Sequence, residues 1–97
     1  MSDVLTAQDF EALAGRDIVL TSEHSVVNVE LKEVQLLKSP SPRPAPPFVA
    51  VFRERGAKRS HAQGLYAVDL GARGIVGVFL VPIGPDGDGM CYEAVFN

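Results

Sequence analysis

The spacing of apolar residues near the start of the chain is that of a short helix. Phe10 and Leu13 recur at helical spacing, and Thr6 is well suited to cap the helix N-terminus with its hydroxyl. Gly15 follows where a left-handed residue commonly ends a helix. The pattern predicts a helix over Thr6–Ala14. Because so short a helix is not stable alone in water, it must pack against the rest of the chain.

From residue 17 onward, apolar and polar residues alternate, which is typical of strands with one buried face. In the second strand the apolar phase slips by one residue near Lys32 and Glu33, as a β-bulge would cause. Without a bend this strand would be about 45 Å long, too long for a small domain. The predicted strands run over about 17–21, 25–38, 48–53, 65–70, 75–83 and 90–96.

Turn and loop signals separate these strands. A proline-rich loop over 39–47 cannot be helix or central strand, and 84–89 is a glycine- and aspartate-rich turn. A chain of 97 residues has the length of one domain. A meander of short strands commonly closes into a barrel, because closure removes exposed edges. We therefore expect a single domain over residues 1–97 that is mainly β, a six-stranded antiparallel barrel-like meander with one short N-terminal α-helix.

Two strands carry apolar residues on both faces. The run Ile75–Ile83 is apolar throughout, and Val49 and Val51 alternate with the Phe48/Phe52 face of their strand. Such runs are typical of strands covered on both sides, and the helix is a candidate for the second cover. Any part left uncovered would be a large apolar patch of the kind that marks an interface. We therefore expect a homodimer or a stable protein partner that contacts Val49, Val51 and one face of Ile75–Ile83.

Net charge narrows the classes of partner. Nine Lys and Arg against twelve Asp and Glu give a net charge of −3, which argues against binding nucleic acid. The N-terminus lacks the basic region of a signal peptide, and the longest apolar run is about half the length that a membrane helix needs. We expect a cytoplasmic protein without a nucleic-acid or membrane partner.

Few residues are arranged for catalysis or metal binding. Cys91 is the one cysteine, so an internal disulfide and a cysteine-based zinc site are excluded. His24 and His61 lie in polar turns without the further ligands that a metal needs. The Asp86–Gly89 turn lacks most ligands of a calcium loop, and no serine lies in a nucleophile elbow. We predict no catalytic residues, no cofactor and no metal, and hence a protein that is not an enzyme.

The basic residues Arg53, Arg55, Lys58 and Arg59 form the one sizeable charge cluster. They indicate either a solvated loop or a surface for an acidic partner. With the proline-rich segment Pro40–Pro47, they are the exposed residues best placed to bind a partner.

A second function remains open, in which the barrel binds a small apolar ligand. Phe48, Phe52, Tyr66 and Phe79 would line the site. Barrels this small are normally filled by their own side chains, so an interaction role is favoured.

The second half of the chain carries a recognisable pattern. The segments Gln63–Tyr66 and Val78–Gly84, followed by the ending Tyr-Glu-Ala-Val-Phe-Asn (Tyr92–Asn97), resemble a small bacterial family of unknown function, and the opening Leu5–Phe10 extends the likeness. The resemblance implies genes that lie beside phage-tail-collar-like proteins, and hence an assembly or accessory role in tail-like fibres. No catalytic residues come with it.

Overall fold

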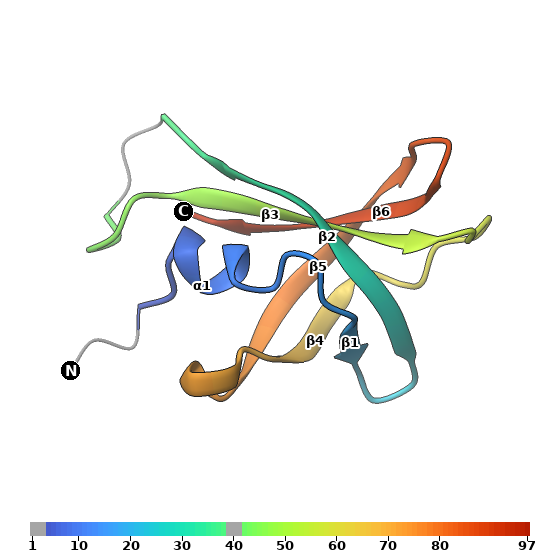
Figure 1. The fold of residues 1–97 in the computed structure, drawn as a ribbon, viewed down its shortest axis with the longest axis horizontal. Coiled ribbons are helices and arrows are strands. Elements are labelled where there is room, and N and C mark those ends of the chain that lie inside the picture. Colours follow the sequence, from blue (N-terminus) through green and yellow to red (C-terminus); the bar gives the residue numbers. More distant parts are fainter. Residues whose placement is uncertain (1–3, 39–41) are drawn as a thin grey trace.

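The computed structural model describes residues 4–38 and 42–97, and it confirms the mainly-β class. Six antiparallel strands close into a barrel in the order β1-β2-β3-β6-β5-β4 (Figure 1). A short helix precedes the strands, and one 3₁₀ turn, η1, lies between β4 and β5. The elements are α1 (Ala7–Glu11), β1 (Ile18–Thr21), β2 (Val26–Leu36), β3 (Phe48–Arg55), β4 (Gly64–Asp69), η1 (Gly71–Arg73), β5 (Ile75–Pro85) and β6 (Gly89–Phe96). All the predicted strands are present.

Helix α1 begins where the sequence indicates. The backbone N–H of Thr6 donates to Asp9 Oδ2 at 2.8 Å, and the N–H of Asp9 donates to Thr6 Oγ1 at 3.4 Å, which together form a capping box. The helix is shorter than the predicted Thr6–Ala14. After Glu11 the backbone hydrogen bonds join residues three apart rather than four, as in a 3₁₀ turn. The N–H of Leu13, for example, donates to the Phe10 carbonyl at 2.9 Å.

Strand β2 bends at the predicted bulge. Its register against β3 shifts between Leu31 and Glu33. Before the bulge β2 pairs with β1, and from Glu30 onward it pairs with β3. One long strand thus forms a corner of the barrel, as bulged strands commonly do.

Strand β5 forms the opposite corner because it changes neighbour part-way along. Residues Ile75–Leu80 pair with β4, and residues Val81–Pro85 pair with β6. A second register shift lies between Pro82 and Gly84. The sequence did not indicate this irregularity or the change of partner.

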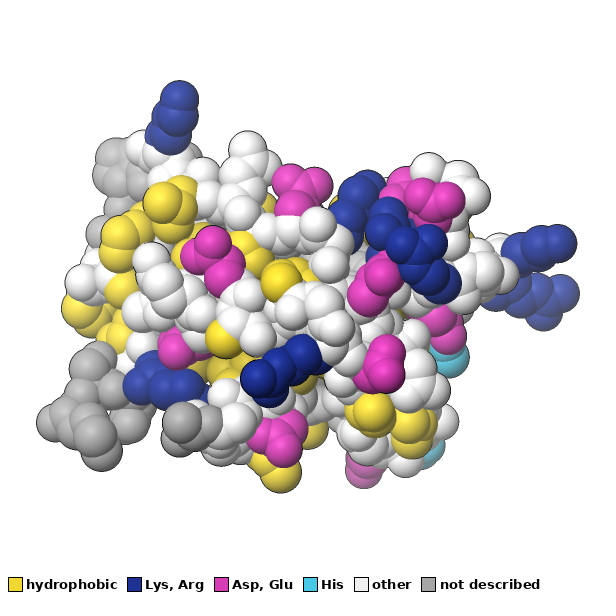
Figure 2. Space-filling model, in the orientation of Figure 1, with side chains coloured by type: hydrophobic (Ala, Val, Ile, Leu, Met, Phe, Trp, Pro, Cys, Tyr) yellow, Lys and Arg dark blue, Asp and Glu magenta, His cyan; other side chains and the backbone are white. Residues whose placement is uncertain are grey.

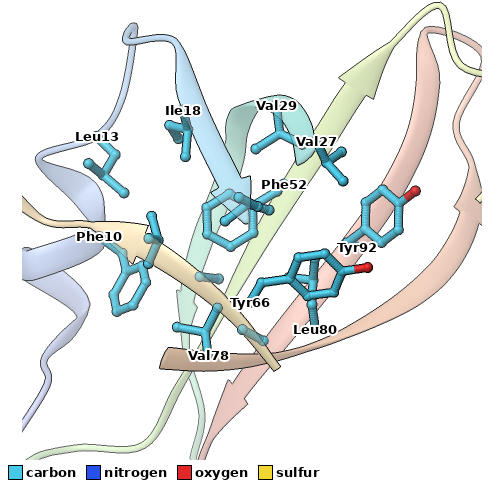
Figure 3. Close-up of a cluster of buried hydrophobic side chains, with 14 of the residues drawn as sticks. Phe10, Leu13, Ile18, Val27, Val29, Phe52, Tyr66, Val78, Leu80 and Tyr92 are labelled. Carbon is cyan, nitrogen blue, oxygen red and sulfur yellow. The ribbon is translucent and has the colours of Figure 1, made fainter. Parts of the chain in front are cut away.

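The helix plugs one end of the barrel. Phe10 is fully buried, with its ring centroid 5.6 Å from Phe48, 6.4 Å from Phe52 and 5.1 Å from Phe96. Figure 3 shows Phe10 entering from α1 toward side chains that point inward from the strands. The prediction that the helix could cover the outer face of Ile75–Ile83 is therefore wrong. The apolar side chains of the helix pack against aromatic side chains inside the barrel instead.

Candidate interaction surface

Three large outward side chains of β4 and β5 form an exposed apolar surface, which the exposed Asp69, opposite Ile75, borders at one end. Leu65 is 69% exposed, Ile75 is 73% exposed and Phe79 is 53% exposed. Leu65 lies directly opposite Phe79 on the neighbouring strand, and Gly77 lies between Ile75 and Phe79 on the same side of β5. Directly opposed side chains of this kind are in contact range. We name Leu65, Ile75, Gly77 and Phe79 the β5 face.

The predicted contact residues Val49 and Val51 differ in exposure. Val49 is half-buried and is paired with Val95, which is 48% exposed. Val51 is only 8% exposed, so the prediction that it offers contact area is wrong for the isolated chain. It lies between Glu33 on β2 and Glu93 on β6, whose long side chains flank it.

The four basic residues of the predicted patch separate into two pairs. Arg53 and Arg55 lie on β3 and both contact Glu30, with Nε–Oε2 distances of 2.7 and 2.8 Å. Arg53 Nη1 also lies 2.8 Å from Asp86 Oδ2, and the Arg53 side chain is 14% exposed. Lys58 lies with Arg59 in the exposed β3–β4 loop.

The first pair is thus committed to an ion-pair cluster, which we define as Glu30, Lys32, Arg53, Arg55 and Asp86. Figure 2 shows acidic and basic side chains side by side at the upper right of the view, and further basic side chains that project beyond them from the same end of the molecule. The hydrogen bond from Arg53 lowers the pKa of Asp86 far below its usual value, and Asp86 in turn raises the pKa of Arg53. The same arginine lowers the pKa of Glu30. These charges pair with one another across β2, β3 and the turn between β5 and β6, and they therefore offer little free charge to an acidic partner.

Cys91 lies on the outer wall beneath this cluster. Its residue is buried, and its Sγ is 4.0 Å from Lys32 Nζ, which is itself 3.0 Å from Asp86. Burial, followed by a hydrogen bond to Asp86, raises the pKa of the Cys91 thiol. A raised pKa disfavours the thiolate, which is the nucleophilic form.

The family comparison covers nearly the whole of this structure. The family model described as "Domain of unknown function (DUF6916)" matches residues 5–96. The chain belongs to the DUF6916 family. No curated protein and no solved structure gives a significant match.

The histidines of this DUF6916 domain lie in separate places. His24 is exposed beside Glu23, at 3.9 Å. His61 lies at the barrel end opposite α1, with its backbone N–H donating to the Tyr92 hydroxyl at 2.8 Å and its Nε2 3.4 Å from Glu54 Oε1. Among residues 4–38 and 42–97, no group of His, Cys, Asp or Glu side chains is clustered closely enough to hold a metal ion. Within the same residues, no helix has the length and apolar character to cross a membrane.

The residues considered for an apolar ligand site do not converge on one cavity. Phe48 and Phe52 are fully buried, and Tyr66 is 3% exposed; all three belong to the packed core. Phe79 points outward, so its placement in a barrel lining is wrong, because the alternation of β5 directs Val78 and Leu80 inward in its place. A hollow of about 360 Å³ beside β1 is lined by Arg16, Asp17 and Asp69 together with apolar residues, so it does not suit a purely apolar ligand.

The proline-rich loop is tied to the barrel. Residues 39–41, which include Pro40 of the predicted Pro40–Pro47 segment, lie outside the described residues. Arg43 Nη1 donates to the Pro46 carbonyl at 2.8 Å, and the guanidinium lies 5.4 Å from the centroid of the Phe48 ring. The described part of the loop is therefore held by a cation–π contact and a local hydrogen bond.

Proposed function

We propose that this DUF6916 domain is a non-enzymatic interaction or assembly module that binds a protein through the β5 face. The observation that carries the proposal is the exposure of Leu65, Ile75 and Phe79 on adjacent strands, where no helix within residues 4–38 and 42–97 covers them. Small monomeric proteins rarely leave neighbouring large apolar side chains in water unless a partner covers them. The net charge of −3 supports a protein partner over a nucleic acid.

The size of this surface limits what it can do alone. Full burial of a large apolar side chain stabilises by about 1.5–3 kcal/mol, and these side chains are already partly covered. The three together would contribute about 3–5 kcal/mol on binding. Association costs about 4 kcal/mol or more in lost translational and rotational freedom. A stable complex therefore needs further contacts, which the backbone of the same region can supply.

The resemblance of the C-terminal segment Tyr92–Asn97 to a bacterial family supports a more specific form of this proposal. In that form the domain is a cytoplasmic accessory to a phage-tail-like fibre system, and its partner is another protein of the assembly. The distribution of surface residues is consistent with such a role, since the β5 face is apolar while the ion-pair cluster is internally neutralised.

The test compares the wild type with a Leu65→Ser/Phe79→Ser double variant. Val26→Ser is the matched control, because Val26 is 63% exposed on β2, away from the β5 face. Light scattering up to about 100 μM measures self-association, and affinity capture from the native host with mass spectrometry measures binding to other proteins. We expect association that the double variant loses and the control keeps. Failure to find any association sensitive to the double variant would contradict the proposal.

A further inference from the structure

Half of β5 is hydrogen-bonded along one edge only. Residues Ile75–Leu80 pair with β4, but the pairing with β6 begins at Val81. Among residues 4–38 and 42–97, no strand pairs with the other edge of this half, although the barrel is closed farther along. Gly77, in the middle, is exposed, and a methyl group built on it would meet no atom within 4 Å. We name Ile75–Leu80 the open edge of β5.

The hydrogen-bond pattern fixes which backbone groups this edge presents. The N–H of Leu70 donates to the Gly74 carbonyl at 2.9 Å, so these two residues face each other across the β4–β5 ladder. Antiparallel pairing alternates, so the even-numbered residues of β5 bond to β4 in turn. Ile75, Gly77 and Phe79 consequently direct their N–H and C=O groups toward the open edge.

This edge is complementary to itself. If two copies pair antiparallel about Gly77, every residue whose N–H and C=O groups point to the open edge lies opposite a residue of the second copy that does the same. Gly77 then lies opposite Gly77, and Ile75 lies opposite Phe79 of the second copy, a pairing of β-branched and aromatic side chains that stabilises sheets. A shift of the register by two residues would place Ile75 opposite Val81, where β6 already occupies the edge, or, in the other direction, Phe79 opposite Arg73, which lies in η1 outside the strand.

We propose that two copies of this domain dimerise by antiparallel pairing of their β5 open edges across a twofold axis at Gly77. This inference rests on the proposed function and names the protein partner as a second copy of the chain, whose β5 lies beside the β5 face in a continuous sheet. The run Ile75–Ile83 contains no charged residue, so the two paired strands carry no like charges themselves; the exposed carboxylate of Asp69 lies opposite Ile75 on β4, one strand away from the pairing. Open apolar edges of this kind commonly pair with another strand.

The dimer joins two barrels through a continuous sheet. The contact is confined to one short strand pair and the β5 face. The surface area that it buries is therefore smaller than the roughly 800 Å² per partner of standard interfaces. We therefore expect reversible association in the micromolar range rather than an obligate dimer.

Amide hydrogen exchange tests the pairing directly in the wild-type protein. At about 500 μM the amides of Ile75, Gly77 and Phe79 should exchange about three- to ninefold more slowly than at about 5 μM, because the monomer fraction of a micromolar dimer falls at most as the square root of the concentration. The amides of Val76 and Val78 should be protected at both concentrations, because they bond to β4. Exchange at Ile75, Gly77 and Phe79 that does not change with concentration would overturn the pairing.

A proline substitution tests it with the apolar side chains left in place. Gly77→Pro removes an N–H that faces the open edge and none that bonds to β4. Gly77→Ala is the matched control, since it keeps the N–H and its methyl group meets nothing within 4 Å. By light scattering at about 100 μM, we expect dimers for the wild type and Gly77→Ala, and monomers for Gly77→Pro.

The outcomes separate this inference from the proposed function. A dimer that survives Gly77→Pro but is lost in Leu65→Ser/Phe79→Ser would overturn strand pairing and leave the β5 face as the binding surface. A wild type that is monomeric throughout would also overturn the inference, and the proposed function would then depend on capture of a different protein. If Gly77→Pro does not fold by circular dichroism, the exchange measurement decides.

Discussion

Replacing Phe10 with alanine tests whether α1 is an integral plug of the barrel. Phe10 is fully buried, and its ring lies within about 6.4 Å, centroid to centroid, of three other phenylalanine rings. The substitution removes this ring from the aromatic cluster and leaves a cavity at the barrel end. Because α1 spans only five residues, it has no stability of its own to keep it in place.

The expected loss is large relative to the whole. Truncation of a buried phenylalanine to alanine typically lowers the free energy of unfolding by about 3–5 kcal/mol. The total free energy of unfolding of a domain of this size is about 5–15 kcal/mol. We therefore expect Phe10→Ala to remove about a fifth or more of the free energy of unfolding.

Equilibrium unfolding in urea measures this loss. Gln8→Ala is the control, since Gln8 is exposed on the same helix. If the N-terminal segment detaches in the variant, less surface is left to expose on unfolding, so the m-value should fall as well. A loss below about 1 kcal/mol, with an m-value like that of the control, would refute the plug.

Two further substitutions test the barrel wall. Asp86→Asn should lower the melting temperature at neutral pH and make it decline less steeply in acid. Because Arg53 lowers the pKa of Asp86, the Asp86 carboxylate stabilises the fold above its unfolded-state pKa, and the wild type loses this contribution as the pH falls from about 5. Thermal melts between pH 7 and pH 3 measure the difference. The same dependence of melting temperature on pH in the wild type and Asp86→Asn would contradict the role of this ion pair. Gly89→Ala should cost about 1–3 kcal/mol in urea unfolding, because its Cβ would lie 2.1 Å from the Glu54 carbonyl oxygen, whereas Gly77→Ala should cost less than about 1 kcal/mol. Near-equal values for the two alanine variants would show that the close approach at Gly89 is not rigid.

Most of the strands could be predicted because they follow a period of two after residue 17, and the uniformly apolar run Ile75–Ile83 has the length of a covered strand. The bulge near Lys32 and Glu33 was also predictable, since one inserted residue shifts every later side chain to the other face. The helix start was set by local groups, Thr6 and Asp9, that lie three residues apart. Features that depend on neighbours in the sequence were therefore recovered.

Features that depend on strand pairing were not recovered. The ion-pair cluster joins Glu30, Arg53 and Asp86 across sequence separations of 23 and 33 residues, and nothing local marks them as partners. Only a register that places Glu30 directly opposite Arg53 could have shown that the basic patch is neutralised. The same limit applies to β5, whose apolar run looks uniformly covered until the pairing shows that its two halves have different neighbours.

The devices that normally protect an edge strand are absent from the half of β5 that needs them. Proteins use charged side chains, prolines or bulges to prevent an open strand edge from pairing with another chain. In β5 both prolines, Pro82 and Pro85, and the register shift lie in the half already paired with β6. The half from Ile75 to Leu80 has no charge, no proline and no bulge, and it places Gly77 where another backbone could approach most closely. An apolar strand with one edge open is stabilised by a contact that pairs its free hydrogen-bonding groups and gives its outward side chains apolar neighbours. A second copy of the same strand does both from the side, because its hydrogen-bonding groups and its apolar side chains recur at matching positions about the same glycine.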